Sequence, residues 1–286
     1  MPKILRDDQV IGYGRDGFIA PVRVMSAEDA AAFRKRFEAY EAQFDGWYEM
    51  SKGQKLHLLQ TWMAELAGHE KIVDAVEDVM GPDVMVWGTS LFIKDAGTED
   101  YVSWHQDSTY WGLSKPDVVT AWVALSPANK VSGCMKMMPG THTWDQVEHT
   151  DTLAAHNLLT RGQEIAVEVD ESQSVLAELK PGEISLHNIR TVHGSEPNRS
   201  DHRRIGVAIR FIAPHVKQVN ADGDSAWLVR GEDKYGHFIL ETPPQADMDA
   251  AAVAEHERIM KLRQGVLYKG VDGDPAHVDL DNANSG

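Results

Sequence analysis

Most of the chain after residue 84 consists of short runs of β-branched and aromatic residues that are separated by turn-forming residues. Runs of this length, at roughly ten-residue spacing, are typical of a β-sandwich or barrel. The chain is therefore expected to be mainly β. The expected strands cover residues 84–93, 101–108, 118–125, 134–138, 165–169, 174–178, 183–188 and 204–211.

Helical periodicity is restricted to the two ends of the chain. Ser26 is expected to cap a helix that extends to about Gln43, because Asp29 occupies the capping-box position. A short strand is expected before this helix, at residues 16–20. Further helices are expected over residues 56–66, 70–80 and 246–264.

The chain contains no stretch typical of a linker between domains. Residues 1–270 are therefore expected to form a single domain, with a β core and flanking N- and C-terminal helices. Residues 271–286 contain four aspartates and little that could pack, so this acidic tail is expected to be mobile. Residues 1–17 are polar and lack the apolar core of a signal peptide.

Charge and composition exclude several classes of partner. With 28 Lys and Arg against 44 Asp and Glu, the net charge of −16 argues against nucleic acid or an anionic membrane surface. No apolar run approaches the roughly 20 residues that span a bilayer. A single cysteine, Cys134, allows no internal disulfide and fits a core position in a cytoplasmic protein. A small-molecule substrate is expected, and no oligomeric state is predicted.

His105 and Asp107 form the first candidate for a metal site. Side chains of a strand alternate between its faces, so these two residues would project from the same side and could bind one metal ion. Taken alone, a His-x-Asp pair also occurs among ordinary surface residues. His193 is the best candidate for a third ligand, with His187 as its main competitor. Two histidines and one carboxylate on one face are the arrangement that holds non-haem Fe(II).

The strand expected at residues 204–211 has an unusual face. Its alternation places Arg204 and Arg210 on one side, separated by Gly206 and Ala208, and aliphatic or aromatic residues on the other. Small residues between two arginines fit the wall of a cavity in which a guanidinium binds an anion through paired hydrogen bonds. A solvated or ion-paired side chain is an equally good interpretation of Arg210.

Together these residues resemble the phytanoyl-CoA dioxygenase family of Fe(II)/2-oxoglutarate oxygenases. The resemblance extends from about residue 12 to 215 and includes Pro181-Gly182-Glu183, where the family usually has Pro-Gly-Asp. It implies a double-stranded β-helix, the jelly roll or cupin-like fold, in agreement with the strand pattern. Further matching stretches are residues 16–18, 120–125, 133–142 and 193–200.

The resemblance also implies roles for particular residues. The iron ligands of the family match His105, Asp107 and His193, with 2-oxoglutarate and O₂ as co-substrates. Arg204 matches the arginine that binds the distal carboxylate of 2-oxoglutarate. Positions that assist co-substrate binding match Ser195 and Trp122, although an ordinary core role for the tryptophan stays open.

Hydroxylation is favoured over halogenation, since related halogenases replace the iron-binding carboxylate with a small residue and Asp107 is present here. Polar residues close to the motifs indicate a small polar substrate with an anionic group. These residues are Lys94, Gln106, Thr109, Tyr110, Asn188, Arg190 and Arg210.

One further similarity indicates which substrate to expect. Residues 103–113 resemble bacterial family members that hydroxylate 2-aminoethylphosphonate at the carbon next to phosphorus, and this compound is the expected substrate. A free amino acid or a natural-product intermediate is the alternative within the family. Two alternatives from other classes are a cupin-like metal isomerase or epimerase, which would not need Arg204, and a non-catalytic jelly-roll binding module.

Overall fold

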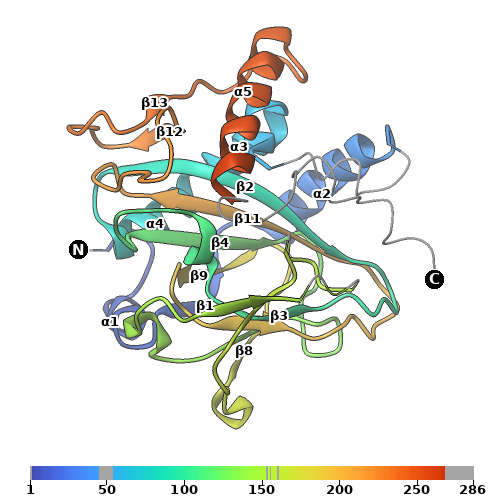
Figure 1. Ribbon diagram of the computed structural model, residues 1–286. Coiled ribbons are helices and arrows are strands. Elements are labelled where there is room, and N and C mark those ends of the chain that lie inside the picture. The colour runs from blue at the N-terminus through green and yellow to red at the C-terminus, as the bar shows by residue number, and fades with distance from the viewer. Residues whose placement is uncertain (1, 45–53, 153, 155, 160, 268–286) are drawn as a thin grey trace.

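The structure, a computed structural model, describes residues 2–44, 54–152, 154, 156–159 and 161–267. Two β-sheets face each other at its centre (Figure 1). The strands are β1 (Phe18–Arg23), β2 (Val84–Lys94), β3 (Val102–His105), β4 (Val118–Ala124), β5 (Met135–Met137), β6 (His149–Asp151), β7 (Gln163–Ile165), β8 (Val175–Ala177), β9 (Glu183–Asn188), β10 (His193–Ser195), β11 (Arg204–Ile212), β12 (Ser225–Arg230) and β13 (Ile239–Leu240).

The major sheet has seven strands in the order β1-β9-β4-β11-β2-β12-β13, and the minor sheet has four in the order β3-β10-β5-β8. Strands β6 and β7 form a separate pair, and β7 contacts β3. All of these pairings are antiparallel except that of β12 with β13. Two facing, mainly antiparallel sheets confirm the expected mainly β, jelly-roll fold.

The two faces of the major sheet differ in chemistry, as β11 shows most clearly. Ile205, Val207 and Ile209 are fully buried on the face that packs against the helices. Fully burying an aliphatic side chain of this size contributes about 1.5–3 kcal/mol, so this face anchors the sheet. The intervening residues of β11 face the minor sheet, and the space between the two sheets contains the cavity described below.

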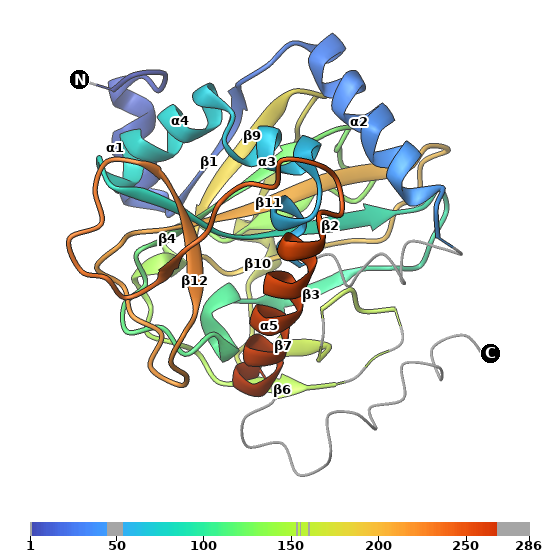
Figure 2. The same ribbon diagram turned by 90° about the horizontal axis from the view of Figure 1, so that it is seen from above.

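Helices cover the outer face of the major sheet (Figure 2). They are α1 (Asp7–Asp16), α2 (Ala27–Glu41), α3 (Thr61–Ala67), α4 (Glu70–Met80) and α5 (Ala250–Leu267). Helix α2 begins as predicted, because the Ser26 hydroxyl accepts a hydrogen bond from the Asp29 amide at 3.0 Å. Helix α4 has the predicted bounds, and its apolar stripe is buried in the core.

Several predicted elements are wrong in extent. The helix expected at residues 56–66 is divided into a 3₁₀ turn, η2 (Leu56–Leu58), and α3, because Gln60 between them is extended. The strand expected at 165–169 corresponds to β7, which ends at residue 165. The strand expected at 101–108 ends at His105, because the following polar residues form a 3₁₀ turn, η3 (Asp107–Tyr110). Two further 3₁₀ turns in the described part of the chain are η4 (Thr141–Thr143) and η5 (Glu171–Gln173).

Sequence reasoning misses α1, β6, β10, β12 and β13. Helix α1 contains two glycines and a weak apolar pattern, so its own propensity is low. Tertiary contacts stabilise this helix instead. Tyr13 is buried in the core, and the segment just before the helix is held by hydrogen bonds from the backbone amides of Lys3, Ile4 and Leu5 to the Asp78 carboxylate. The acidic tail predicted at 271–286 lies outside the described residues.

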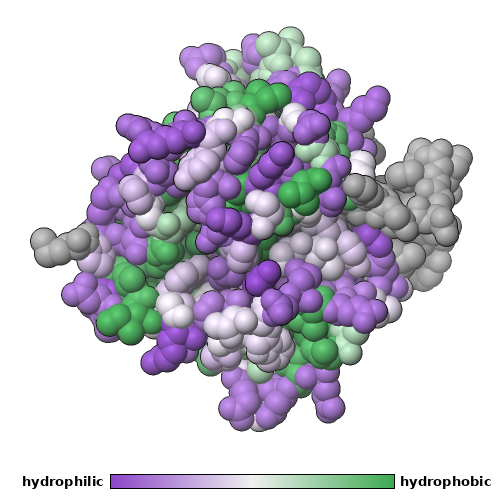
Figure 3. All heavy atoms as spheres, turned by 60° about the vertical axis from the view of Figure 1, so that its left-hand side comes forward, coloured by the Kyte–Doolittle hydropathy of each residue, from purple (hydrophilic) through white to green (hydrophobic). Residues whose placement is uncertain are grey.

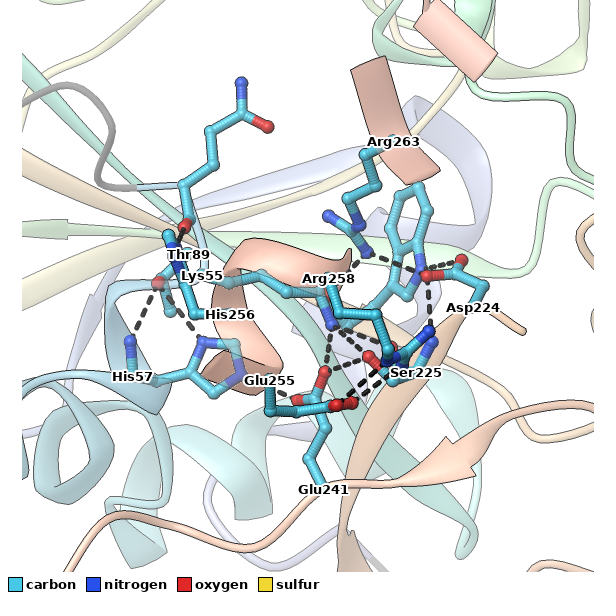
Figure 4. A network of polar contacts seen from close by, with 12 residues as sticks. Lys55, His57, Thr89, Asp224, Ser225, Glu241, Glu255, His256, Arg258 and Arg263 are labelled. Carbon is cyan, nitrogen blue, oxygen red and sulfur yellow. Dashed lines mark hydrogen bonds and ion pairs between the residues drawn. The ribbon is translucent and has the colours of Figure 1, made fainter. Parts of the chain in front are cut away.

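A buried polar network joins α5 to the outer face of the major sheet (Figure 4). Lys55 is fully buried, and its ammonium group donates hydrogen bonds to the Glu241 carboxylate and to the Ser225 carbonyl. The other Glu241 oxygen lies 2.9 Å from His57 Nε2. Lys55 and Glu241 therefore pair their charges, and the hydrogen bonds connect three segments that are distant in the sequence. None of these side chains lines the cavity described below.

The surface shown in Figure 3 is mixed, with small hydrophobic groups scattered among hydrophilic residues. No helix within the described ranges combines the length and apolar character needed to cross a membrane. Cys134 is buried, and burial raises the pKa of its thiol to about 11, which agrees with a core position.

Candidate metal centre and its cavity

A cavity lies between the two sheets, with about 410 Å³ of empty space when the part open to solvent is included. Its walls come from strands that are far apart in the sequence, chiefly β2, β3, β4, β9, β10 and β11. The lining residues are Phe92, Val102, His105, Asp107, Thr120, Trp122, Met135, His187, His193, Gly194, Ser195, Arg204, Ala208 and Arg210.

The predicted triad comes together in this cavity. His105 and His193 are directly opposite each other on the paired strands β3 and β10, and their ring centroids are 4.2 Å apart. Gln106 continues the extended backbone past the end of β3, so Asp107 projects to the same side as His105. One donor atom from each of the three residues lies within 4.8 Å of the others, a spacing compatible with a single metal ion.

The backbone fixes the orientation of both imidazoles. His105 Nδ1 lies 2.9 Å from the Ser103 carbonyl, and His193 Nδ1 lies 2.9 Å from the Thr191 carbonyl. A carbonyl only accepts hydrogen bonds, so each Nδ1 carries the proton and each Nε2 keeps a free lone pair. Histidine ligands of metals are held in this way in general.

The ionisation states also fit a metal. Burial would raise the pKa of Asp107, but the nearby His105 and His187 rings, His193 and Arg210 hold it well below its usual range. Burial, together with the His105 and His187 rings, keeps the pKa of His193 well below its usual range. The site therefore presents a carboxylate and a neutral imidazole, and this donor set fits ferrous iron.

The competing ligand His187 lies beside the triad. Its ring centroid is 4.7 Å from that of His193, and its Nε2 is 3.6 Å from Asp107 Oδ2. Thr120 approaches the same oxygen from β4, with its hydroxyl 3.3 Å away. The other oxygen, Oδ1, faces His105 Nε2 at 3.5 Å. His187 is thus placed to orient the carboxylate while His193 completes the group of three.

The other end of the cavity is formed around Arg204, which is 1% exposed. Its Nη1 donates a hydrogen bond to the Gly133 carbonyl at 2.7 Å, while its Nε has no partner among the described residues. The guanidinium carbon lies 5.3 Å from the centre of the Trp122 ring. A buried guanidinium with unused donors is well suited to bind a carboxylate in two places.

Lys94 supports this end from behind. It pairs with Arg204 across β2 and β11, and its ammonium group contacts the Ser195 hydroxyl at 2.7 Å and the Glu196 carbonyl at 2.5 Å. Burial, together with repulsion from Arg204, lowers the pKa of Lys94 to about 6. The structure therefore places Lys94 behind Ser195 rather than among the residues that line the cavity.

Five other predicted substrate residues do not line the cavity. The side chains of Gln106 and Asn188 are hydrogen-bonded to backbone groups of the loops around them. Thr109 bonds to His149 and to the Gln106 carbonyl, Tyr110 donates to Asp151, and Arg190 lies 4.0 Å from Asp145. Closeness to the motif in sequence did not place these residues in the site.

Sequence reasoning missed Thr120 and Phe92 as lining residues. Thr120 shares a strand face with Trp122, so strand alternation from that residue could have found it. Phe92 could have been found only from the pairing of β2 with β11, which places it opposite Gly206.

Comparison with known proteins agrees with this geometry. The family described as phytanoyl-CoA dioxygenase (PhyH) matches residues 13–206. A protein of Stutzerimonas stutzeri named "Probable alpha-ketoglutarate-dependent hypophosphite dioxygenase" is 26% identical over 64% of this chain, and the match covers 60% of that protein. The ectoine dioxygenase of Nocardia farcinica is 25% identical over 72% of this chain and 78% of its own length.

A solved structure also resembles the fold over most of its length. The non-heme monooxygenase ThoJ, in its apo form, has a TM-score of 0.81 and 33% sequence identity. The superposition covers 91% of this chain and 97% of ThoJ. The described helices and sheets therefore share the fold of ThoJ.

Proposed function

The chain belongs to the phytanoyl-CoA dioxygenase family, and on that premise we propose that it is an iron(II)- and 2-oxoglutarate-dependent hydroxylase of a small polar molecule that carries an anionic group. One observation carries the proposal. His105, Asp107 and His193 converge in the cavity that also contains the buried Arg204. Two histidines and a carboxylate bind iron from one side and leave positions for other ligands.

The residues of the site have three different roles. His105, Asp107 and His193 hold the metal, and Thr120 and His187 orient the free oxygen of the carboxylate. Arg204 binds the distal carboxylate of 2-oxoglutarate, and Ser195, held by Lys94, assists it. When bound, iron and 2-oxoglutarate supply the oxidation, in which one oxygen atom of O₂ enters the substrate and the other enters succinate, with release of CO₂.

The protein also protects the reaction from water. Trp122 and Phe92 form apolar walls beside Arg204, so the co-substrate lies in a site with few competing hydrogen-bond partners. No acid–base pair is needed from the chain, and none of the described lining residues forms a carboxylate dyad. The presence of Asp107 leaves no vacant ligand position of the kind a halide would occupy.

For the substrate we propose 2-aminoethylphosphonate, hydroxylated at the carbon next to phosphorus. The relative named as a hypophosphite dioxygenase supports a phosphorus oxyanion. The ectoine dioxygenase supports the second candidate, a free amino acid or related carboxylate. Both candidates carry an anionic group, in keeping with a cavity that two arginines line.

Succinate release tests the proposal directly. Purified protein is supplied with Fe(II), 2-oxoglutarate and O₂, and then with aminophosphonates, hypophosphite, amino acids or betaines in turn. We expect succinate to form rapidly only with the true substrate, whose product gains one oxygen atom in mass. The Asp107→Ala protein serves as the control and should release none.

Other outcomes identify the alternatives. A product of unchanged mass and inverted configuration would indicate an epimerase or isomerase. Binding of ligands without any turnover of 2-oxoglutarate, in the presence of Fe(II), would indicate a binding module. Either result would overturn the hydroxylase assignment.

A further inference from the structure

The cavity contains a second arginine, Arg210, which binds neither the metal nor 2-oxoglutarate in the proposed function. Arg210 lies on the same face of β11 as Arg204, six residues further along. At about 3.3 Å per residue, their Cα atoms are about 20 Å apart, so the two arginines serve opposite ends of the cavity. Arg210 belongs to the end that contains Asp107, because it pairs across the sheet with Thr120, which contacts that carboxylate.

We infer that Arg210 is the receptor for an anionic group of the substrate, a carboxylate or a phosphonate, an inference that rests on the proposed function. The guanidinium has five N–H donors. One of them, on Nη1, bonds to the Ser90 hydroxyl at 2.8 Å, whereas Nε is buried without a partner among the described residues. No carboxylate of the described residues forms an ion pair with it. An anion that enters the cavity would satisfy these donors.

The guanidinium is held in place before any ligand arrives. Its carbon lies 5.0 Å from the centre of the Trp111 ring, and that ring packs edge-on against Trp87 at 5.1 Å. Trp87 in turn donates a hydrogen bond to Asp224 at 2.7 Å and is covered by Arg263 of α5 at 4.3 Å. A fixed guanidinium loses little entropy when it binds an anion, so the arrangement favours binding.

The charges in the cavity require an anion as well. Asp107 is the one carboxylate among the described residues that line it. When a divalent metal and the 2-oxoglutarate dianion are bound, the charges of these two groups, of Asp107 and of the two arginines sum to one net positive charge. An anionic group of the substrate would neutralise this charge, and Arg210 is the arginine that 2-oxoglutarate leaves free to bind it.

Calorimetry on inert protein tests the inference without turnover. The protein is loaded with Zn(II) and 2-oxoglutarate and titrated with methylphosphonate, with propionate, and with neutral dimethyl methylphosphonate. We expect wild type to bind at least one of the two anions and not the neutral ester. Stronger binding of methylphosphonate than of propionate would assign the site to phosphonates, and the reverse order to carboxylates.

Variants then locate the site. Arg210→Gln should weaken anion binding at least tenfold, because a charge-assisted pair of hydrogen bonds is lost, while 2-oxoglutarate binding changes less than about threefold. Arg204→Gln should show the opposite pattern. The matched control is Arg199→Gln, which removes an exposed arginine paired with Glu99 and should change neither affinity. If Arg210→Gln does not fold, Arg210→Lys, which keeps the charge but loses the planar fork, should still weaken binding measurably.

Three results would overturn the inference. They are anion binding by Arg210→Gln (or by Arg210→Lys where only that variant folds) at the wild-type affinity, failure of wild type to bind either anion, and loss of 2-oxoglutarate affinity in Arg210→Gln as large as in Arg204→Gln. The measurement involves no oxidation. A protein that binds anions through Arg210 but never releases succinate would therefore refute the proposed reaction and leave the anion site intact.

Discussion

Gly206 offers a sharp test of how the co-substrate end of the cavity is built. It lies on β11 between Arg204 and Ala208, and the Trp122 ring of the neighbouring strand lies directly over it. A methyl group built on Gly206 would lie 1.8 Å from Trp122 Cζ2, whereas ordinary van der Waals contact begins at 3.4 Å. The substitution Gly206→Ala therefore forces the ring or the strand to move by about 1.6 Å, the difference between those two distances.

Two losses are expected from this displacement. Overpacking of a buried site costs about 1–3 kcal/mol of stability. Moving the ring also takes it away from the Arg204 guanidinium, which forfeits a buried cation–π contact worth about 2 kcal/mol and disturbs the arginine itself. We expect the free energy of unfolding to fall by about 3–5 kcal/mol, the sum of the two losses, and the Kd for 2-oxoglutarate to rise about tenfold or more.

Urea denaturation and calorimetry with 2-oxoglutarate measure the two effects. The control is Gly265→Ala in α5, where an added methyl group meets nothing within 4 Å and the helix gains up to about 1 kcal/mol in propensity. A double variant, Gly206→Ala with Trp122→Leu, should recover part of the lost stability but not the affinity. A Gly206→Ala protein as stable as wild type, with unchanged affinity for 2-oxoglutarate, would refute the placement of Trp122 over the strand.

Four further predictions concern the metal, the co-substrate and the buried network. Asp107→Ala should weaken metal binding more than about 100-fold in equilibrium dialysis. His187→Phe leaves all three ligands in place and should weaken it only roughly 10–100-fold. Equal losses in the two variants would show that His187 is itself a ligand. Arg204→Ala should raise the 2-oxoglutarate concentration needed for half-maximal turnover about 10–100-fold, and an unchanged value would show that another residue binds the co-substrate. Glu241→Gln leaves Lys55 buried without a counter-charge and should destabilise the protein by about 3 kcal/mol at pH 7 in urea denaturation. Burial opposes ionisation of Glu241, yet Lys55 and His57 lower its pKa to about 2. The stability difference between wild type and Glu241→Gln should therefore be complete above pH 4.5 and should vanish as the pH falls towards 2. A stability difference that is independent of pH would contradict this.

The sequence alone determined the faces of the longer strands and some of the local elements. The period of β11 separates its arginines from its aliphatic residues, and the same period places His105 and Asp107 on one side. The capping box at Ser26 and the apolar stripe of α4 likewise depend on residues a few positions apart, so local rules suffice for them. The likeness to the family then indicated what such a set of residues does.

The tertiary structure decided which of the sequence candidates share the cavity. Strand β10 consists of His193, Gly194 and Ser195, which have little intrinsic strand preference, and it forms because β3 and β5 pair with it on both sides. Gln106 and Arg190 are close to the metal ligands in sequence, yet they point into the surrounding loops.

Pairing between strands that are distant in the sequence is the physical reason why the sequence determined strand faces but not the contents of the cavity. The cavity is closed by strands whose paired residues lie more than sixty residues apart in the sequence. Their register, which depends on packing over the whole sheet, sets which side chains meet. A pattern within one strand determines the face on which Arg204 and Arg210 lie. Only the assembled sheets decide that this face borders a cavity, with the metal cluster and Arg210 at one end and Arg204 at the other.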